Sequence, residues 1–255
     1  MLQENLERGR IYRGMSEDLE KVGRGPRERR SHSRAGISQL LGLPLGLLKG
    51  FLLRNASILI LLTMFLVFFT QIVGQFVLGS VFTHYLAASQ ATVLARPWTL
   101  VTSIFAHGGF LHLLVNSIVL FFFGPALEGR IGRNRFVQLF LGAGILAVVA
   151  QLLVASPNVF VLGASGAILG LLGTLTILAP RTPVLLFFII PMPLWLLTLG
   201  YGTFSAIMVF TGAGGPIAHT AHFSGLIIGL LYGYKLRRER RYMHPLEKTI
   251  SRYHW

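Results

Sequence analysis

Residues 163–170 read GASGAILG and stand near the start of an uncharged apolar segment, Val161–Ala179. A segment of this length falls within the roughly 17–25 apolar residues that a helix needs to cross a bilayer. Its residues are apolar on all sides rather than along one stripe, which is typical of a helix with no water-facing side. The stretch therefore predicts a membrane-spanning helix with a serine, Ser165, near its beginning.

The composition of the whole chain supports this interpretation. Of 255 residues, 53% are hydrophobic and 13% are charged, and the mean hydropathy is +0.64. A soluble domain has about one quarter charged residues. The period-two alternation of a membrane β-barrel is absent, so helices remain the only means of crossing. We expect an integral membrane protein of the all-α class.

Six segments are predicted to span the membrane. They are Ala56–Gly79, Phe110–Leu127, Phe136–Ala155, Val161–Ala179, Val184–Thr211 and Ile217–Tyr234. The predicted organisation is a basic N-terminal tail with an interfacial segment (1–55), a six-transmembrane-helix bundle (56–235) and a basic C-terminal tail (236–255). The segment 80–109 is too long for a simple turn, and we expect it to fold against the outer leaflet.

The formal net charge of +14 is distributed as membrane topology requires. Eleven of the 23 Lys and Arg residues precede Ala56, and seven follow Tyr234. Six spans with cytoplasmic termini leave only Arg96 on the outer side, in agreement with the positive-inside rule. The charge therefore predicts orientation and attraction to anionic membrane lipids, and we expect no nucleic-acid partner. Neither the oligomeric state nor the source membrane is predicted.

Two strips of small residues point to a contact between distant segments. Ser165 is followed by Gly166, Gly170 and Gly173, and His222 by Gly225 and Gly229. Small residues let membrane helices approach closely. Each strip alone is typical of packing, but the two together would bring a serine hydroxyl beside an imidazole. A serine becomes a nucleophile when an adjacent base accepts its proton.

A second pair of polar residues lies in the predicted span Phe110–Leu127. His112 and Asn116 are four residues apart and share one helix face. They are either hydrogen-bonding groups between helices or donors for an oxyanion, together with the backbone N–H of Ser165. No carboxylate is available for a catalytic triad, since Glu128 lies among Arg130, Arg133 and Arg135 and is expected to pair with one of them. The chemistry would then use a Ser–His dyad.

Three stretches in order carry a resemblance to a known family. HGGFLHLLVNSIVLFFFGPALEGRIGRNRF (107–136), GASG (163–166) and AHFSGLIIG (221–229) resemble the rhomboid intramembrane serine proteases over residues 56–235. The resemblance implies Ser165 as nucleophile, His222 as base and His112 and Asn116 at the oxyanion site. Gly163 belongs to the serine motif by the same match.

The resemblance also implies substrates that are single-span membrane proteins, cut within or just outside their spans. Two positions depart from the family pattern: Thr99 follows Trp98 where the family often has arginine, and Leu169 stands where an aromatic often supports the histidine. We expect the fifth span to act as a gate, because Pro191 and Pro193 would weaken its hydrogen bonds. The stretch TGAGGP (211–216) is expected to cap the site.

Three functions remain for this sequence. The first is a serine endopeptidase that needs no cofactor or metal. The second is a non-catalytic rhomboid-like protein that binds membrane helices. The third is a histidine-based metal transporter or metalloprotease, since neutral imidazole binds transition metals, although the H-E-x-x-H motif is absent. The chain contains no cysteine, which excludes thiolate nucleophiles and Cys-based metal sites.

Overall fold

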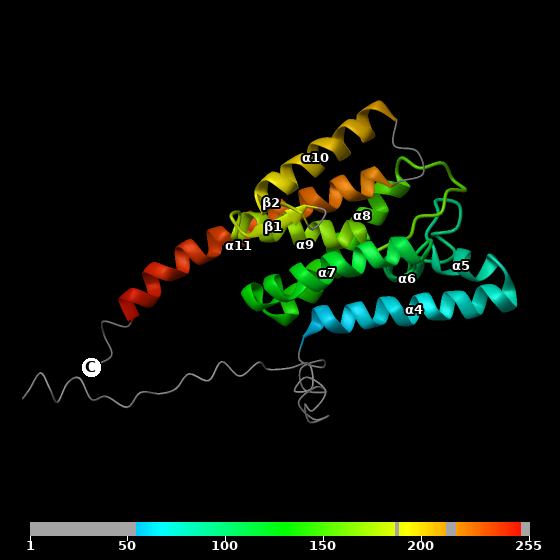
Figure 1. The fold of residues 1–255 in the computed structure, drawn as a ribbon, viewed down its shortest axis with the longest axis horizontal. Helices are drawn as coiled ribbons and strands as arrows, with labels where there is room; N and C mark the ends of the chain where they lie inside the picture. Colours follow the sequence, from blue (N-terminus) through cyan, green and yellow to red (C-terminus); the bar gives the residue numbers. More distant parts are fainter. Residues whose placement is uncertain (1–54, 187–188, 213–217, 251–255) are drawn as a thin grey trace, which may run out of the picture. The chain divides into compact units, whose positions relative to one another are not determined.

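The computed structural model describes residues 55–186, 189–212 and 218–250, with side chains up to Glu239. The described helices and strands appear in chain order in Figure 1. They are α4 (Ala56–Leu78), α5 (Val81–Leu86), α6 (Thr99–Phe105), α7 (Phe110–Ile131), α8 (Arg133–Leu152), α9 (Ser165–Leu178), β1 (Pro183–Leu186), β2 (Ile190–Pro193), α10 (Leu194–Thr211) and α11 (His219–Ile250). The predicted tail and interfacial segment (1–55) lie outside the described residues apart from Asn55, as does most of the predicted cap at 211–216.

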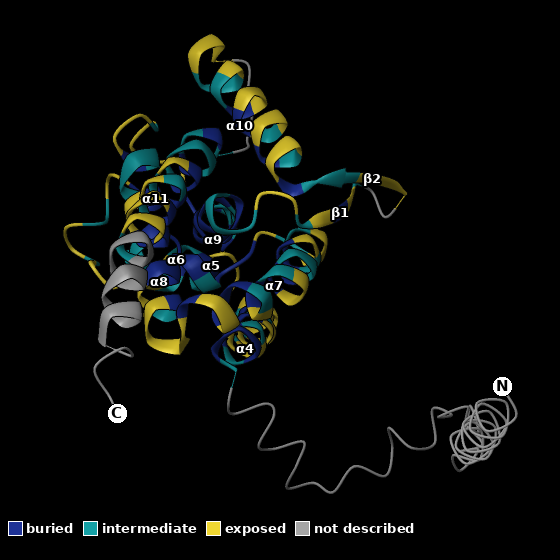
Figure 2. Cartoon of the chain, turned by 90° about the vertical axis from the view of Figure 1, so that its left-hand side faces the viewer, coloured by how far each residue is buried: buried dark blue, intermediate teal, exposed yellow. Residues whose placement is uncertain are grey.

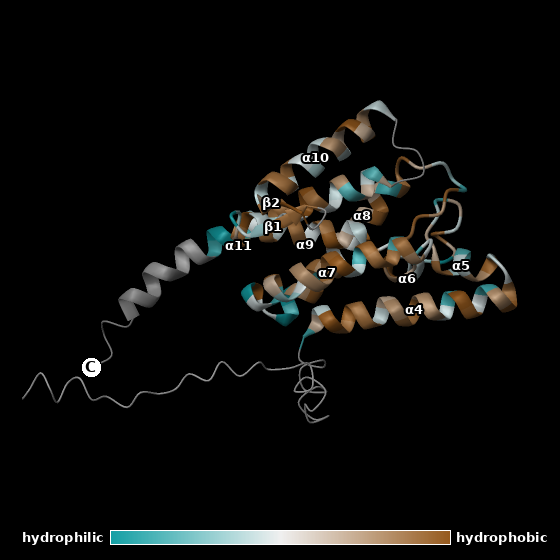
Figure 3. Cartoon of the chain, viewed as in Figure 1, coloured by the Kyte–Doolittle hydropathy of each residue, from teal (hydrophilic) through white to brown (hydrophobic). Residues whose placement is uncertain are grey.

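A helix occupies at least part of each of the six segments predicted to span. Four of these helices, α4, α7, α8 and α10, are long and apolar enough to cross a membrane, and α9 is a shorter apolar helix of 14 residues. Hydrophobic residues run along α4 and α7 in Figure 3. The predicted boundary between residues 235 and 236 falls within α11, which continues to Ile250. Six crossings stay a prediction.

Helix α9 lies among the other long helices and packs against α7, α8, α10 and α11. Figure 2 shows it enclosed and mostly buried, whereas α10 is largely exposed. The contact between α9 and α11 is close because glycines face one another: a Cβ on Gly225 would overlap the carbonyl oxygen of Gly166. A hydroxyl group supports the contact further along the two helices, where Thr174 Oγ1 donates to the Gly229 carbonyl oxygen at 2.9 Å.

A buried carboxylate joins the end of α7 to the beginning of α4. Glu128 accepts hydrogen bonds from the backbone N–H of Ala56 (2.7 Å) and Ser57 (2.9 Å), and from Ser57 Oγ (2.8 Å). The first N–H groups of a helix have no acceptor within the helix, and a carboxylate there also favours the helix dipole. The sequence predicted an arginine partner for Glu128 and did not predict this capping role.

The fifth predicted span, Val184–Thr211, is helical only from Leu194 onward. The residues before it form the antiparallel pair β1–β2, with Val184 opposite Met192 and Leu186 opposite Ile190. Pro191 and Pro193 therefore lie in β2, before the helix. The prediction that they weaken the hydrogen bonds of the fifth helix is wrong, because both prolines precede that helix. Proline has no N–H to donate within a helix, and it is accommodated at a strand edge or just before the first helical turn.

The connection between α4 and α7 folds into α5 and α6 rather than forming an open loop. Trp98 Nε1 donates to the carbonyl oxygen of Tyr85 at 3.3 Å, and the Arg96 guanidinium lies 4.9 Å from the Tyr85 ring centroid. The arginine of this segment is therefore Arg96, two residues before Trp98, whereas the family pattern often has arginine directly after the tryptophan. Thr99, which follows it, is buried and donates its hydroxyl to the Arg96 carbonyl.

Candidate active site

Ser165 is the first residue of α9, at the point where an irregular segment turns into the helix. The turn requires glycine at residue 163, whose φ of +121° is a conformation that other residues rarely adopt. The backbone N–H of Gly163 donates to the Ser103 carbonyl oxygen at 2.8 Å, which ties the turn to α6. The serine hydroxyl is thereby held at a helix N-terminus, beside backbone N–H groups that have no partner within the helix.

The Ser165 hydroxyl and the His222 imidazole are hydrogen-bonded. The distance from Ser165 Oγ to His222 Nε2 is 2.6 Å. His222 is in the first turns of α11, and its distance from the serine is set by the glycine contacts between α9 and α11 described above. A serine–imidazole pair at this distance permits proton transfer from the hydroxyl to the ring.

A third side chain, which the sequence did not single out, completes the arrangement around His222. Tyr201 of α10 places its hydroxyl 2.7 Å from His222 Nδ1, and the two ring centroids are 6.0 Å apart. The aromatic residue that was expected four positions after the serine is Leu169 in this chain, so the aromatic contact to His222 comes from another helix. The sequence feature that could have pointed to Tyr201 is its position as a lone tyrosine between Gly200 and Gly202 in an apolar segment.

His112 lies against Gly163 of the serine motif. The position that a Cβ would take on Gly163 is 2.6 Å from His112 Cε1 and 2.7 Å from its Nε2, so the ring rests directly on the glycine. Asn116, one turn further along α7, is buried and donates its side-chain amide to the His112 carbonyl oxygen at 3.1 Å. The structure thus places the His112 ring against Gly163, which is two residues before Ser165 in the chain, and Asn116 one turn further along α7.

The helix that carries His222 is fixed at its beginning by α8. Gln151 Oε1 accepts a hydrogen bond from the backbone N–H of Ala221 at 3.1 Å. This N–H is one of the groups that a helix cannot satisfy internally at its N-terminus. Gln151, a polar residue within the predicted span Phe136–Ala155, therefore orients the turn that precedes the imidazole.

Two further histidines surround the pair without contacting the serine. The ring centroid of His219 is 6.1 Å from that of His222 and 5.5 Å from that of Phe204. His107 packs edge-on against His112, and its main chain is held by Gln71 of α4. Burial, with the nearby His112, lowers the pKa of His107 to about 4, so this imidazole is neutral at neutral pH.

The carboxylates with described side chains lie elsewhere. Glu128 caps α4, and Glu239 lies 3.8 Å from Arg135 at the protein surface. Within the described ranges there is no group of three His, Cys, Asp or Glu side chains that could hold a metal ion. The site therefore consists of a hydroxyl, imidazoles, a phenol and an amide.

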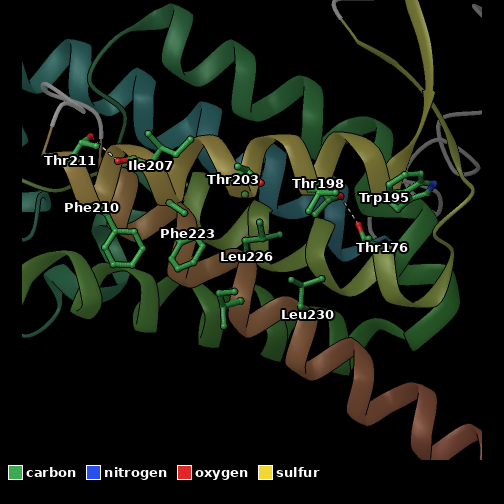
Figure 4. A pocket seen from close by; sticks show the side chains of 14 residues that line it. Thr176, Trp195, Thr198, Thr203, Ile207, Phe210, Thr211, Phe223, Leu226 and Leu230 are labelled. Atoms are coloured by element: carbon green, nitrogen blue, oxygen red, sulfur yellow. Dashed lines mark hydrogen bonds between the residues drawn. The ribbon is translucent and has the colours of Figure 1, made fainter.

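An apolar groove of about 600 Å³ runs between α10 and α11 (Figure 4). Its lining includes Phe223 and Gly202, the sequence neighbours of His222 and Tyr201, but neither Ser165 nor His222 itself. At one end of the groove, the hydroxyls of Thr176 and Thr198 are hydrogen-bonded at 2.7 Å. Phe210, toward the other end, is 84% exposed. Helix α10 is thus tied at its beginning and sparsely packed at its end.

Comparison with known proteins assigns the chain to a family. The Rhomboid domain matches residues 94–239, more than half of the chain. Rhomboid protein 1, mitochondrial, of Saccharomyces cerevisiae is 30% identical over 154 residues, covering 55% of this chain and 42% of that protein. Rhomboid protease GluP of Bacillus subtilis is 34% identical over 135 residues, covering 52% and 24%. Rhomboid protease GlpG of Yersinia pseudotuberculosis is 30% identical over 141 residues, covering 54% and 47%.

The chain belongs to the rhomboid family, which confirms the resemblance found in the sequence. With its apolar helices it is an integral, multi-pass membrane protein. The matched region is less than half the length of each of these three relatives.

Proposed function

We propose that this protein is a serine endopeptidase that hydrolyses peptide bonds in or near the transmembrane segments of other membrane proteins. The observation that carries the proposal is the 2.6 Å hydrogen bond between Ser165 Oγ and His222 Nε2. Membership of the rhomboid family and the names of the two bacterial relatives, both called rhomboid proteases, support the same function.

In the proposed acylation step, Ser165 Oγ attacks the carbonyl carbon of the scissile bond. His222 Nε2 takes the hydroxyl proton, and its Nδ1–H donates to the Tyr201 oxygen, 2.7 Å away. In this tautomer the Tyr201 oxygen accepts from Nδ1–H, and Nε2 is free to accept the proton from Ser165. When the tetrahedral intermediate breaks down, His222 gives the proton to the leaving amine nitrogen. The products are an ester on Ser165 and a free amine.

The negative oxygen of the tetrahedral intermediate needs hydrogen-bond donors. We assign this role to the imidazole of His112, the side-chain amide of Asn116 and the backbone N–H of Ser165. Each such donor contributes about 3 kcal/mol to stabilising the transition state in acyl-transfer enzymes. Gly163 supports this assignment, because the absence of a side chain there allows the His112 ring to rest against the serine motif.

Deacylation reverses the roles. A water molecule attacks the ester carbonyl carbon and loses a proton to His222 Nε2. The Ser165 oxygen then leaves and receives that proton from the imidazolium. The products are the new carboxyl terminus of the substrate and the regenerated hydroxyl, so the cycle needs no metal or cofactor.

The partners follow from the location of the site. The proposed substrates are membrane proteins with a single span, and helices that unwind easily are preferred because an intact helix hides its carbonyls in hydrogen bonds. We propose that they enter past α10, whose most apolar 18-residue window is only 17% buried, against 33–44% for α4, α7 and α8.

We further propose that both termini face the cytoplasm. The beginning of α4 is joined to the end of α7 by Glu128, and Arg135 at the beginning of α8 lies 3.8 Å from Glu239 of α11. These contacts bring the basic stretch Arg130–Arg135 to the same end of the bundle as the basic residues of α11 just before Glu239, namely Lys235, Arg237 and Arg238. The positive-inside rule places this end in the cytoplasm and Ser165 toward the opposite side.

A direct test uses purified protein in lipid nanodiscs with a panel of single-span substrates. Ser165→Ala is expected to abolish cleavage. Ser224→Ala is the matched control, because this hydroxyl only bonds backbone carbonyls within α11. A serine-directed fluorophosphonate should label the wild-type protein and fail to label His222→Ala. Substrate binding without cleavage or labelling would instead show a non-catalytic membrane-helix binder, and loss of activity in excess chelator would favour the metal alternative.

A further inference from the structure

The hairpin β1–β2, which connects α9 to α10, has an unusual backbone edge. Residues of an antiparallel pair alternate between bonding to the partner strand and facing outward. Leu194 N donates to Thr182 O at 2.9 Å just below the hairpin, so Val184–Met192 and Leu186–Ile190 are the bonded pairs that follow. The outward-facing residues are Pro183 and Leu185 of β1 and Pro191 and Pro193 of β2.

Three of these four outward residues are prolines, which carry no N–H. Leu185 is therefore the only residue in the two strands that directs a backbone donor away from the pair. An ordinary edge strand exposes a row of donors and acceptors, which excludes it from an apolar phase and invites pairing with another strand. The outer edges of this hairpin carry only one N–H donor. Their outward-facing carbonyl groups can stay hydrated at the depth of the lipid headgroups.

The exposed side chains are also apolar. Pro183, Leu185 and Pro191 share the face turned away from the helices, while Val184 on the other face is buried. Leu185 is 58% exposed, and Ile189 beside the turn is 79% exposed. Figure 2 shows the hairpin extending away from the helices. This is an apolar projection rather than part of the core.

The flanking residues match a membrane surface. Arg181 precedes the hairpin and is exposed, and Trp195 follows it with 44% of its surface exposed. No charged residue lies between Arg181 and Lys235. Tryptophan and arginine on either side of an apolar segment are typical of the headgroup level, where each has one wet and one apolar end.

We propose that the β1–β2 hairpin is a lipid anchor that inserts into the leaflet at the end of the bundle where α9 terminates. It lies at the opposite end of α9 from Ser165, so the proposal does not depend on proteolysis. Backbone bonds from Leu194 and Trp195 to Thr182 and Pro180 join the hairpin to α10. The anchor therefore holds the beginning of α10 at a fixed depth. Pairing with a peptide or a second copy through the edge of β2 is disfavoured, because β2 offers no outward N–H, and β1 offers only that of Leu185.

The natural absence of cysteine allows the depth to be measured with single nitroxide labels. We would label Leu185→Cys or Ile189→Cys in nanodiscs and compare collision with oxygen, which partitions into lipid, and with a water-soluble nickel complex. Phe69→Cys, exposed in the middle of α4, is the lipid reference, and Glu239→Cys is the water reference. Both hairpin labels should show an oxygen-to-nickel ratio severalfold above the Glu239 label and below the Phe69 label.

A ratio equal to that of Glu239 would overturn the anchor. Protection from both reagents would also overturn it, because it would show protein, such as a second copy, covering the hairpin. Pro191→Ala provides a test of the backbone argument, since it adds one outward N–H. It should shift the Ile189 label toward water, whereas Ile190→Val, where the N–H already faces β1, should not. Equal depths in the two variants would show that the missing donors are unimportant.

Discussion

The hydroxyl of Tyr201 lies 2.7 Å from Nδ1 of His222. This contact joins α10, the least buried of the four long apolar helices, to the imidazole that faces Ser165. Both ring nitrogens of His222 are thereby engaged, one by a phenol and one by the serine hydroxyl. The position of α10 is consequently linked to the orientation of the proposed base.

Removal of this hydroxyl tests whether Tyr201 positions His222. Tyr201→Phe should lower kcat by about 2- to 10-fold, since a hydrogen bond of this kind contributes about 0.5–1.5 kcal/mol, and should leave KM nearly unchanged. The ¹⁵N shifts of His222 should move toward a mixture of tautomers. Tyr234→Phe, an exposed tyrosine on α11, is the control. Unchanged kcat and unchanged shifts would show that the phenol has no positioning role.

The turn before Ser165 should tolerate no side chain at residue 163. In Gly163→Ala, the new methyl group would meet the His112 ring, and the φ of +121° would be strained. We expect a loss of at least about tenfold in kcat/KM, in line with about 1–3 kcal/mol of backbone strain. Gly142→Ala is the control, because a Cβ there meets no atom within 4 Å. Equal kinetics in the two variants would contradict the close contact between residue 163 and His112.

The Glu128 carboxylate should contribute to stability rather than to chemistry. Glu128 accepts three hydrogen bonds, and in Glu128→Gln the new NH2 group would face N–H or O–H donors of α4 instead of accepting from them. This should lower the free energy of unfolding by about 1–3 kcal/mol. A clear fall in Tm with near-normal kcat for the folded fraction is expected. Glu239→Gln removes an exposed pair and should change stability by less than about 1 kcal/mol. If Glu128→Gln and Glu239→Gln have the same Tm, the proposed capping role of Glu128 is wrong.

The proposed gate predicts different effects of two cross-links on α10. A disulfide between Thr176→Cys and Thr198→Cys would tie the beginning of α10, where the two hydroxyls already meet, and cleavage should persist. A short bis-maleimide between Ile207→Cys and Phe223→Cys would close the groove between α10 and α11 and should slow cleavage strongly. Reagents that react with only one cysteine are the control. Full activity in the second cross-linked variant would remove the gate.

The sequence by itself determined the family and the membrane location, because apolar length and the ordered motifs are local properties of the chain. It also led to the pair Ser165 and His222, since glycine strips at helical spacing predict a close helix contact. The prediction for Pro191 and Pro193 was wrong because a short apolar run with prolines is compatible with either a kinked helix or an edge strand. The pairing of β1 with β2 in a short hairpin decided this.

Only the tertiary structure showed which other residues lie around the candidate site. Tyr201 is 21 residues from His222 along the chain, and nothing in its local pattern indicates which face of α10 meets α11. Glu128 reaches Ser57 across 71 residues, although its sequence neighbours are arginines. In both cases a polar group in an apolar environment finds a partner wherever packing brings one. The packing of whole helices, rather than the local sequence, determines that choice.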